Sequence, residues 1–187
     1  MMLPVLSATL VATLVPLAAT LPAFSASSRA YAVPPAVVKS LMDAGDNCIL
    51  PKEFNITNFR IFTPAPGNKQ SQLISFDFFD DSTSIATSCA FNGSSPNVAP
   101  FDFTPRYPCE DWRITFIWTN QTQALTMIEK ACPDVFETPM EASGDILTNG
   151  TLRCLETSTD NPYGPGLDCM SFQKYSAKYF SFQPTPW

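Results

Sequence analysis

Histidine is absent from this 187-residue chain, and its absence excludes several kinds of catalytic site. Neither a Ser-His-Asp nor a Cys-His site can be assembled, because both need an imidazole as the general base. The chain also has no Cys-x-x-Cys pair and no Cys/His cluster with the spacing of a zinc site. We therefore expect the protein to hold no metal and no cofactor.

Positively charged residues are few. The 11 Lys and Arg residues stand against 17 Asp and Glu, which gives a formal charge of −6 with no long run of either sign. Nucleic acids are bound largely through clustered Lys and Arg that displace counterions from the phosphates. Anionic membrane surfaces attract the same clusters. We therefore expect no nucleic acid partner and, after removal of the signal segment described below, no membrane partner.

Long helical periodicity is missing as well, and 18 prolines disfavour long helices. Beyond Asp46 the apolar residues alternate with polar ones instead. In SQLISFDFFD, residues Ile74, Phe76 and Phe78 share one face, which is typical of a half-buried antiparallel strand. EFNITNFRIF, residues 53–62, shows the same alternation with one phase slip, which predicts a β-bulge.

A second pair of strands is predicted around residue 120. WRITFIW places every second residue on one face, and QALTMIEKA, residues 123–131, is its expected hairpin partner, with Asn120 at the tip. The residues on the shared face are Trp112, Ile114, Phe116 and Trp118. Seven or eight such strands joined by Pro, Gly and Asn turns predict an all-β barrel or sandwich.

The N-terminus has the pattern of a secretory signal. An apolar run from Leu3 to Ala19 is followed by small residues, so we assign residues 1–26 to a signal, with cleavage between 19 and 32. An uncleaved anchor is the alternative, and the short core and its prolines disfavour it. Residues 27–45 form a leader or a short helical segment, and residues 46–187 form one domain.

Six cysteines and four glycosylation acceptors agree with export. An even number of cysteines in a secreted chain indicates disulfides, although the residues alone allow fifteen pairings. The cysteines are Cys48, Cys89, Cys109, Cys132, Cys154 and Cys169. The acceptor asparagines are Asn55, Asn92, Asn120 and Asn149. Asn149-Gly150 also suits a tight hairpin turn, so its sequon has a purely structural interpretation too.

Without histidine, paired carboxylates are the remaining means of catalysis. A glycoside hydrolase needs two acidic groups about 5 to 10 Å apart. The candidates are Asp77, Asp80 and Asp81, then Glu110 with Asp111, and Asp134 with Glu137. Each also fits a turn, a strand entrance or a wet strand face, and DDSTS lacks the spacing of a calcium loop. We therefore predict no enzyme.

Three aromatic residues are candidates for a recognition surface. Tyr107, Tyr163 and Trp187 lie beside prolines or at the terminus, where exposure is common. Amphipathic rings give a large contact area at little entropic cost. The alternative interpretation is packing over one end of the barrel.

Read in order, four stretches resemble one family, the fungal secreted proteins similar to the major allergen of Alternaria, including elicitor-like members. They are FNITNFRIFTP, ISFDFFDDSTSIATSC, RYPCEDWRITFIW and LRCLETSTDNPYGPGLDCMSF. Together they span residues 48 to about 182, nearly the whole expected domain. The resemblance implies a compact antiparallel β-barrel or barrel-like sandwich, stapled by disulfides and secreted, without a known general catalytic activity.

The resemblance also implies a disulfide pattern. Cys89 would pair with Cys109 and Cys154 with Cys169, while the N-terminal cysteine of the family can link two chains. Here Cys132 is additional and offers Cys48 a partner within the chain. We therefore expect a third bridge between them and a monomer or a non-covalent homodimer.

The function implied by the resemblance is that of a secreted, virulence-associated effector or elicitor-like binder at the host interface, with a host extracellular protein as its partner. Two alternatives remain open. One is a β-barrel that carries a small apolar ligand. The other is a carboxylate-dependent glycoside hydrolase that acts on the cell wall.

Overall fold

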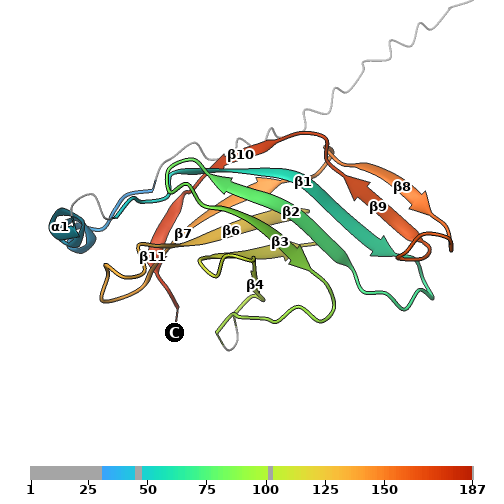
Figure 1. Ribbon diagram of the computed structural model, residues 1–187, viewed down its shortest axis with the longest axis horizontal. Helices are drawn as coiled ribbons and strands as arrows, with labels where there is room; N and C mark the ends of the chain where they lie inside the picture. The colour runs from blue at the N-terminus through green and yellow to red at the C-terminus, as the bar shows by residue number, and fades with distance from the viewer. Residues whose placement is uncertain (1–30, 45–47, 101–102, 187) are drawn as a thin grey trace, which may run out of the picture.

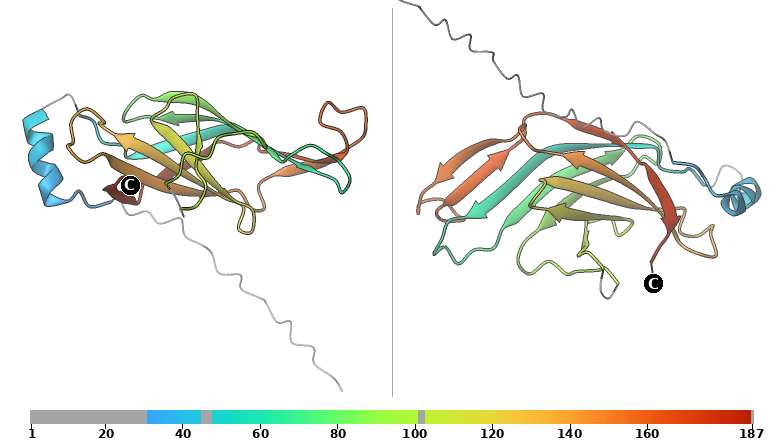
Figure 2. Two further views of the ribbon diagram at one scale, coloured as in Figure 1. Left: turned by 90° about the horizontal axis from the view of Figure 1, so that it is seen from below. Right: turned by 180° about the vertical axis from the view of Figure 1, so that it is seen from behind.

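The computed structural model describes residues 31–44, 48–100 and 103–186. These residues form two antiparallel β-sheets in two layers, with one short helix beyond one end (Figures 1 and 2). The expected signal, residues 1–26, and Trp187 lie outside the described part of the chain. Within that part, no helix has the length and apolar content needed to cross a bilayer.

Neither sheet closes on itself among the described strands. The first has six strands in the order β3-β2-β1-β9-β8, with β10 also paired to β1. Its strands are β1 (Glu53–Pro64), β2 (Leu73–Asp80), β3 (Ala86–Phe91), β8 (Arg153–Thr157), β9 (Gly166–Met170) and β10 (Tyr175–Lys178). The second has five strands in the order β11-β7-β6-β5-β4. They are β4 (Tyr107–Pro108), β5 (Ile114–Thr119), β6 (Ala124–Ala131), β7 (Met140–Leu147) and β11 (Ser181–Pro184).

Strand β1 bends where the sequence predicts a bulge, and that prediction is confirmed. Its register with β2 shifts between Thr57 and Arg60, and Asn58 between them has a φ of 54°. Asparagine tolerates this left-handed conformation better than most residues. Because of the shift, the apolar residues on both sides of the bulge are buried: Phe54, Ile56, Phe59 and Ile61.

Aromatic side chains fill the space between the sheets. Phe76 of β2 meets Phe116 of β5 edge to face, with 5.0 Å between ring centroids. Phe54 of β1 packs against Tyr179 at 4.9 Å. Gly144 of β7 permits this packing, because a Cβ there would lie 2.7 Å from the Phe54 ring. The apolar-ligand alternative needs an open interior, and this filled core gives it no support.

The two sheets form a sandwich and not a barrel. The expectation of an antiparallel all-β fold is confirmed, and of its two forms the structure has the sandwich. The edge strands β3 and β4 come together through a bridge between Cys89 and Cys109. Among the described strands no pairing joins the opposite edges, β8 and β11. Of the outer edges of the two sheets, only β3 and β4 are therefore paired in the described structure.

The hairpin predicted at Asn149-Gly150 is wrong. A turn does form there, with Gly150 at a φ of 76°. However, it joins β7 of the second sheet to β8 of the first, so the two strands do not pair. Turn residues set the local backbone direction, but they do not determine which sheet the next strand enters.

Three disulfides cross-link the domain in the pairs expected from the sequence. Cys48–Cys132 ties the segment before β1 to the end of β6. Cys89–Cys109 joins the edges of the two sheets. Cys154–Cys169 links residues that face each other across β8 and β9. No cysteine of the described chain is free.

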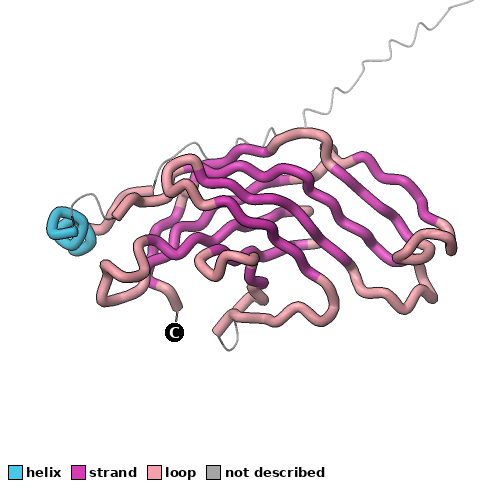
Figure 3. The backbone as a smooth tube through the Cα atoms, viewed as in Figure 1, coloured by secondary structure: helices cyan, strands magenta, loops and turns pink. Residues whose placement is uncertain are grey.

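The leader expected over residues 27–45 contains helix α1 (Pro35–Ala44). Val37 and Leu41 pack against the edge of the core, while Met42 is 78% exposed. Figure 3 shows the helix set apart from the strands at one end of the molecule. Its contact with the sandwich is therefore confined to one face of the helix.

Candidate functional site

A groove of about 430 Å³ lies where β2 and β6 end and β3 and β5 begin. We name it the Trp112 groove. Its apolar wall is formed by Ile49, Ile85, Pro133 and Val135 beside Cys132. Its polar residues are Thr83, Arg113, Glu129, Lys130 and Asp134. The Cys48–Cys132 disulfide borders the groove, so its walls belong to a cross-linked end of the fold.

Trp112 lies at the rim of the groove, and its predicted inward position is wrong. Its side chain is 60% exposed, whereas Ile114 and Phe116 of the same stretch are fully buried. The Ile114 N–H donates to the Asp111 carbonyl at 3.0 Å, so Trp112 belongs to a turn and not to the alternating strand. The Lys130 ammonium lies 4.8 Å from the indole centroid, a cation–π distance that holds the ring in place.

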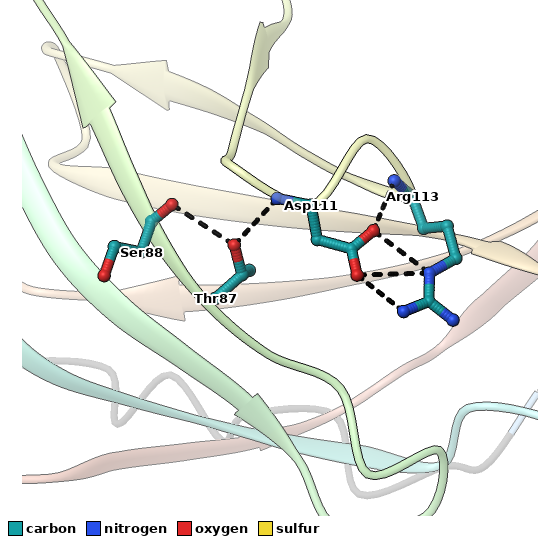
Figure 4. Close-up of polar contacts among 4 residues, drawn as sticks. All are labelled: Thr87, Ser88, Asp111 and Arg113. Carbon is teal, nitrogen blue, oxygen red and sulfur yellow. Dashed lines mark hydrogen bonds and ion pairs between the residues drawn. The ribbon is translucent and has the colours of Figure 1, made fainter.

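Arg113 is fixed by its neighbour Asp111 (Figure 4). Its Nε donates to both Asp111 carboxylate oxygens at 3.0 and 3.2 Å, and Nη2 donates at 2.5 Å. The Asp111 N–H donates to Thr87 Oγ1 of β3 at 2.9 Å, which ties the pair to the first sheet. These hydrogen bonds lower the pKa of Asp111 and raise the pKa of Arg113. Both residues therefore stay charged.

Two buried carboxyl groups meet beneath the groove. Asp80 ends β2 and is fully buried, and Glu129 of β6 is 1% exposed, so they come from opposite sheets. Asp80 Oδ1 accepts from the N–H groups of Ser82 and Thr83 at 2.6 and 2.9 Å. Glu129 Oε2 accepts from the Tyr179 hydroxyl at 2.7 Å. The two carboxyls are close enough for the charge of Asp80 to act on Glu129.

Both carboxyls of this pair have raised pKa values. Burial, followed by the charge of Asp80, raises the pKa of Glu129 to about 8. Burial also raises the pKa of Asp80, although hydrogen bonds from the backbone of Thr83 and Ser82 oppose that rise. Asp80 Oδ2 has no hydrogen-bond partner among the described residues. The raised pKa favours the protonated form of Glu129 at neutral pH.

The carboxylates named from the sequence do not form a hydrolase site. Asp80 is fully buried and does not line the groove, whereas a glycosidase needs two carboxyl groups that both reach the substrate. Asp77 accepts hydrogen bonds from two neighbouring side chains, Asn58 at 2.7 Å and Ser88 at 2.9 Å. The others are scattered: Asp81 bonds Asn55, Asp111 pairs with Arg113, Glu110 and Glu137 are exposed, and Asp134 lines the groove.

The calcium interpretation of DDSTS has no support either. Within the described ranges, no group of three or more Cys, Asp or Glu side chains is placed to hold a metal ion. The stretch forms the turn after β2, with the Asp80 carboxylate capping two N–H groups of that turn.

The expected recognition surface is not assembled from its described members. Tyr107 packs between Phe91 and Phe116, with ring centroids 4.4 and 5.8 Å away. Tyr163 lies between β8 and β9 and packs on Phe62 at 5.5 Å. Both rings are half-buried on different sheets, which agrees with the alternative of a packing role. Trp187 lies outside the described residues.

The four acceptor asparagines differ in accessibility. Asn92, Asn120 and Asn149 are exposed at turns. Asn55 is 8% exposed, its Nδ2 donates to Asp81 at 2.8 Å, and its Oδ1 accepts from Ser176 at 2.7 Å. Because a glycan attaches to Nδ2, it would break the first bond and would have no space.

We expect Asn55 to carry no glycan when the protein is secreted from a eukaryotic host. The Trp118 and Gln72 side chains donate to Asn120 Oδ1, so a glycan on its Nδ2 leaves these bonds intact. Site-resolved glycopeptide mass spectrometry should find sugar only among the three exposed sites, and Asn120→Gln should raise gel mobility if that site is used. Glycan at Asn55 in the folded protein would contradict the structure.

Glu129 and Tyr179 were not predicted as site residues, although the sequence contains a signal for Glu129. In ALTMIEKA the inward positions run Leu125, Met127 and Glu129, which places a carboxyl group in the core. Asp80 stands in phase with Phe76 and Phe78 in the same way. A charged residue at an inward strand position requires a buried partner.

The comparisons with known proteins concern the fold. No protein-family model matches the chain, and no curated protein does. A crystal structure of the Alternaria alternata major allergen Alt a 1 is similar, with a TM-score of 0.47 and 13% identity, over 76% of this chain and 98% of the allergen chain. A second structure of this allergen has a TM-score of 0.48 and 12% identity, over 72% and 92%. The groove is therefore interpreted from the side chains of this chain alone.

Proposed function

We propose that the protein is an extracellular binding protein without catalytic turnover, of the effector or elicitor type that acts between a fungus and its host. Three disulfides support an oxidising, extracellular location. The observation that carries the proposal is the Trp112 ring, 60% exposed beside a groove and held by Lys130. Exposed, preorganised aromatic rings are the residues that most often dominate binding interfaces.

Binding without turnover is supported by the groups in the groove. Glu129 is paired with Asp80 and Tyr179 in the core, and Arg113 is engaged by Asp111. Asp134 is thus the one unpaired carboxylate among the described lining residues. A lone carboxylate does not supply the acid and base, or acid and nucleophile, that carboxylate-dependent hydrolysis requires.

Capture of a host component tests this function. The oxidised protein, immobilised and exposed to plant extracellular fluid, is expected to retain a component that a reduced and denatured sample does not. Trp112→Ala should lower the recovery at least about tenfold, because truncating an aromatic anchor that dominates an interface costs about 2 kcal/mol or more. Quantitative mass spectrometry of retained proteins and glycans provides the measurement.

A matched variant distinguishes binding in the groove from non-specific adsorption to exposed aromatic residues. Phe172 is another exposed aromatic residue, 73% accessible, with the Arg153 guanidinium 5.7 Å from its ring. Phe172→Ala removes the same kind of cation–aromatic contact outside the groove and should leave recovery unchanged. Equal losses in both variants, or no retained component at all, would refute the proposed function.

A further inference from the structure

The polar and aromatic lining of the Trp112 groove indicates which ligand it accepts. We infer that the groove binds a neutral oligosaccharide, an inference that rests on the proposed binding function and specifies its ligand class. Three properties of the groove lead to this class: its balanced charge, its polar side chains and its aromatic rim.

The charges of the groove cancel. Lys130 and Asp134 contribute one charge of each sign, and the Arg113 cation is neutralised by the bidentate contact with Asp111. Glu129 is kept neutral by its burial and by the adjacent Asp80. A phosphorylated or polycarboxylated ligand would therefore meet no excess of opposite charge, and the net charge of −6 opposes its approach. The balance favours an uncharged ligand.

The polar groups of the groove exclude an apolar ligand. The groove presents the charged side chains of Arg113, Lys130 and Asp134. Covering these groups with hydrocarbon would leave them without hydrogen-bond partners, which is unfavourable for any buried polar group. Arg113 Nη1 and the Lys130 ammonium remain as donors, and Asp134 as an acceptor. Hydroxyl groups both donate and accept, so a polyhydroxylated ligand satisfies both kinds.

The rim supplies the flat surfaces that sugar rings need. One face of Trp112 is covered by Lys130, and the indole is still 60% exposed, which leaves aromatic surface open to a ligand. The electron-rich face of an indole attracts polarised C–H bonds, which pyranose rings present on their flat sides. Pro133 adds a second apolar surface. A volume of about 430 Å³ fits a short oligosaccharide within the usual range of small-ligand sites.

Calorimetric titration of the full oxidised protein tests the ligand class. The probes are cellotetraose and chitotetraose as neutral sugars and tetragalacturonate as the acidic one. We expect a neutral tetrasaccharide to bind at least about tenfold more tightly than tetragalacturonate. Trp112→Ala should weaken that binding at least about tenfold, and Asp134→Ala, which removes the exposed acceptor of the groove, about fivefold.

Two controls make the outcome decisive. Phe172→Ala should bind the sugar like the wild type, and thermal unfolding shows whether each variant is folded. If Trp112→Ala fails to fold, Asp134→Ala decides the question alone. Preference for tetragalacturonate, or neutral-sugar binding that neither variant changes, would overturn the inference. If no sugar binds while capture of a host protein still depends on Trp112, the inference fails and the proposed function stands.

Discussion

The folded protein is expected to lose stability steadily as the pH rises from about 4.5 to about 8. Over this range Glu129 ionises in the unfolded chain, where its pKa has the ordinary value of 4.5, but stays protonated in the folded chain, where burial raises its pKa to about 8. Unfolding then releases a proton, so each increase in pH favours the unfolded state. The loss is on the order of a few kcal/mol and is complete above the folded pKa. The raised pKa of Asp80 acts in the same direction.

On the acidic side the dependence reverses. The pKa of Asp111 is lowered by its hydrogen bonds with Arg113, so the stability from that pair is lost as the pH falls through the lowered value. An optimum in mildly acidic solution follows. A protein stabilised mostly by ionised carboxylates would instead gain stability as the pH rises from acidic to neutral.

Urea unfolding at a series of pH values from 4 to 9, followed by tryptophan fluorescence, measures the effect. Glu129→Gln has the shape of the protonated side chain and can donate to Asp80, so its stability should change far less between pH 5 and pH 8. Glu137→Gln alters an exposed carboxylate and should keep the wild-type slope. A wild-type stability that rises from pH 5 to pH 8 would show that Glu129 is ionised in the fold.

Removing the Cys48–Cys132 disulfide is the second large change that we expect. The two cysteines are 84 residues apart, so the bond closes the longest loop of the three disulfides. The chain-entropy model gives about 4.5 kcal/mol for a loop of that length. The other two disulfides span 20 and 15 residues and should contribute only about 3 kcal/mol each. The double variant Cys48→Ala/Cys132→Ala should therefore be the least stable of the three double variants.

Chemical denaturation of the three double variants under oxidising conditions gives this ranking. The Cys154→Ala/Cys169→Ala protein is the internal reference, because its bond lies within one pair of adjacent strands. The denaturant slope must be compared as well, since removal of a cross-link expands the unfolded chain. Equal losses in all three variants would show that strain or solvation, and not loop length, controls the stabilisation.

Local alternation was enough to predict much of the fold. The inward residues of β2 and the phase slip of β1 could be read directly, because each depends on residues a few positions apart. Trp112 was misplaced because a turn that ends at Ile114 interrupts the alternation just before β5. Alternation reports the face of a side chain only while the strand continues.

The groove and the carboxyl pair depended on contacts that no local pattern contains. Asp80 and Glu129 stand 49 positions apart and belong to different sheets, so each could be placed inward but not opposite the other. For the same reason, the passage of the chain from the second sheet to the first after Asn149-Gly150 could not be predicted. The turn has the same residues whichever sheet β8 joins. The pairing of sheets is a property of the whole chain.

The disulfide and the β-bridge between Cys89 and Cys109 limit how the two sheets can separate. The covalent bond and the bridge hold the β3 and β4 edges together, whereas β8 and β11 at the far edges have no such tie in the described structure. Separation of the layers is restricted at this edge and also at the Cys48–Cys132 disulfide, which joins the segment before β1 to the end of β6. Amide protons of β8, at an edge without a cross-link to the other sheet, should exchange with solvent before those beside Cys89 and Cys109, because partial opening exposes them first.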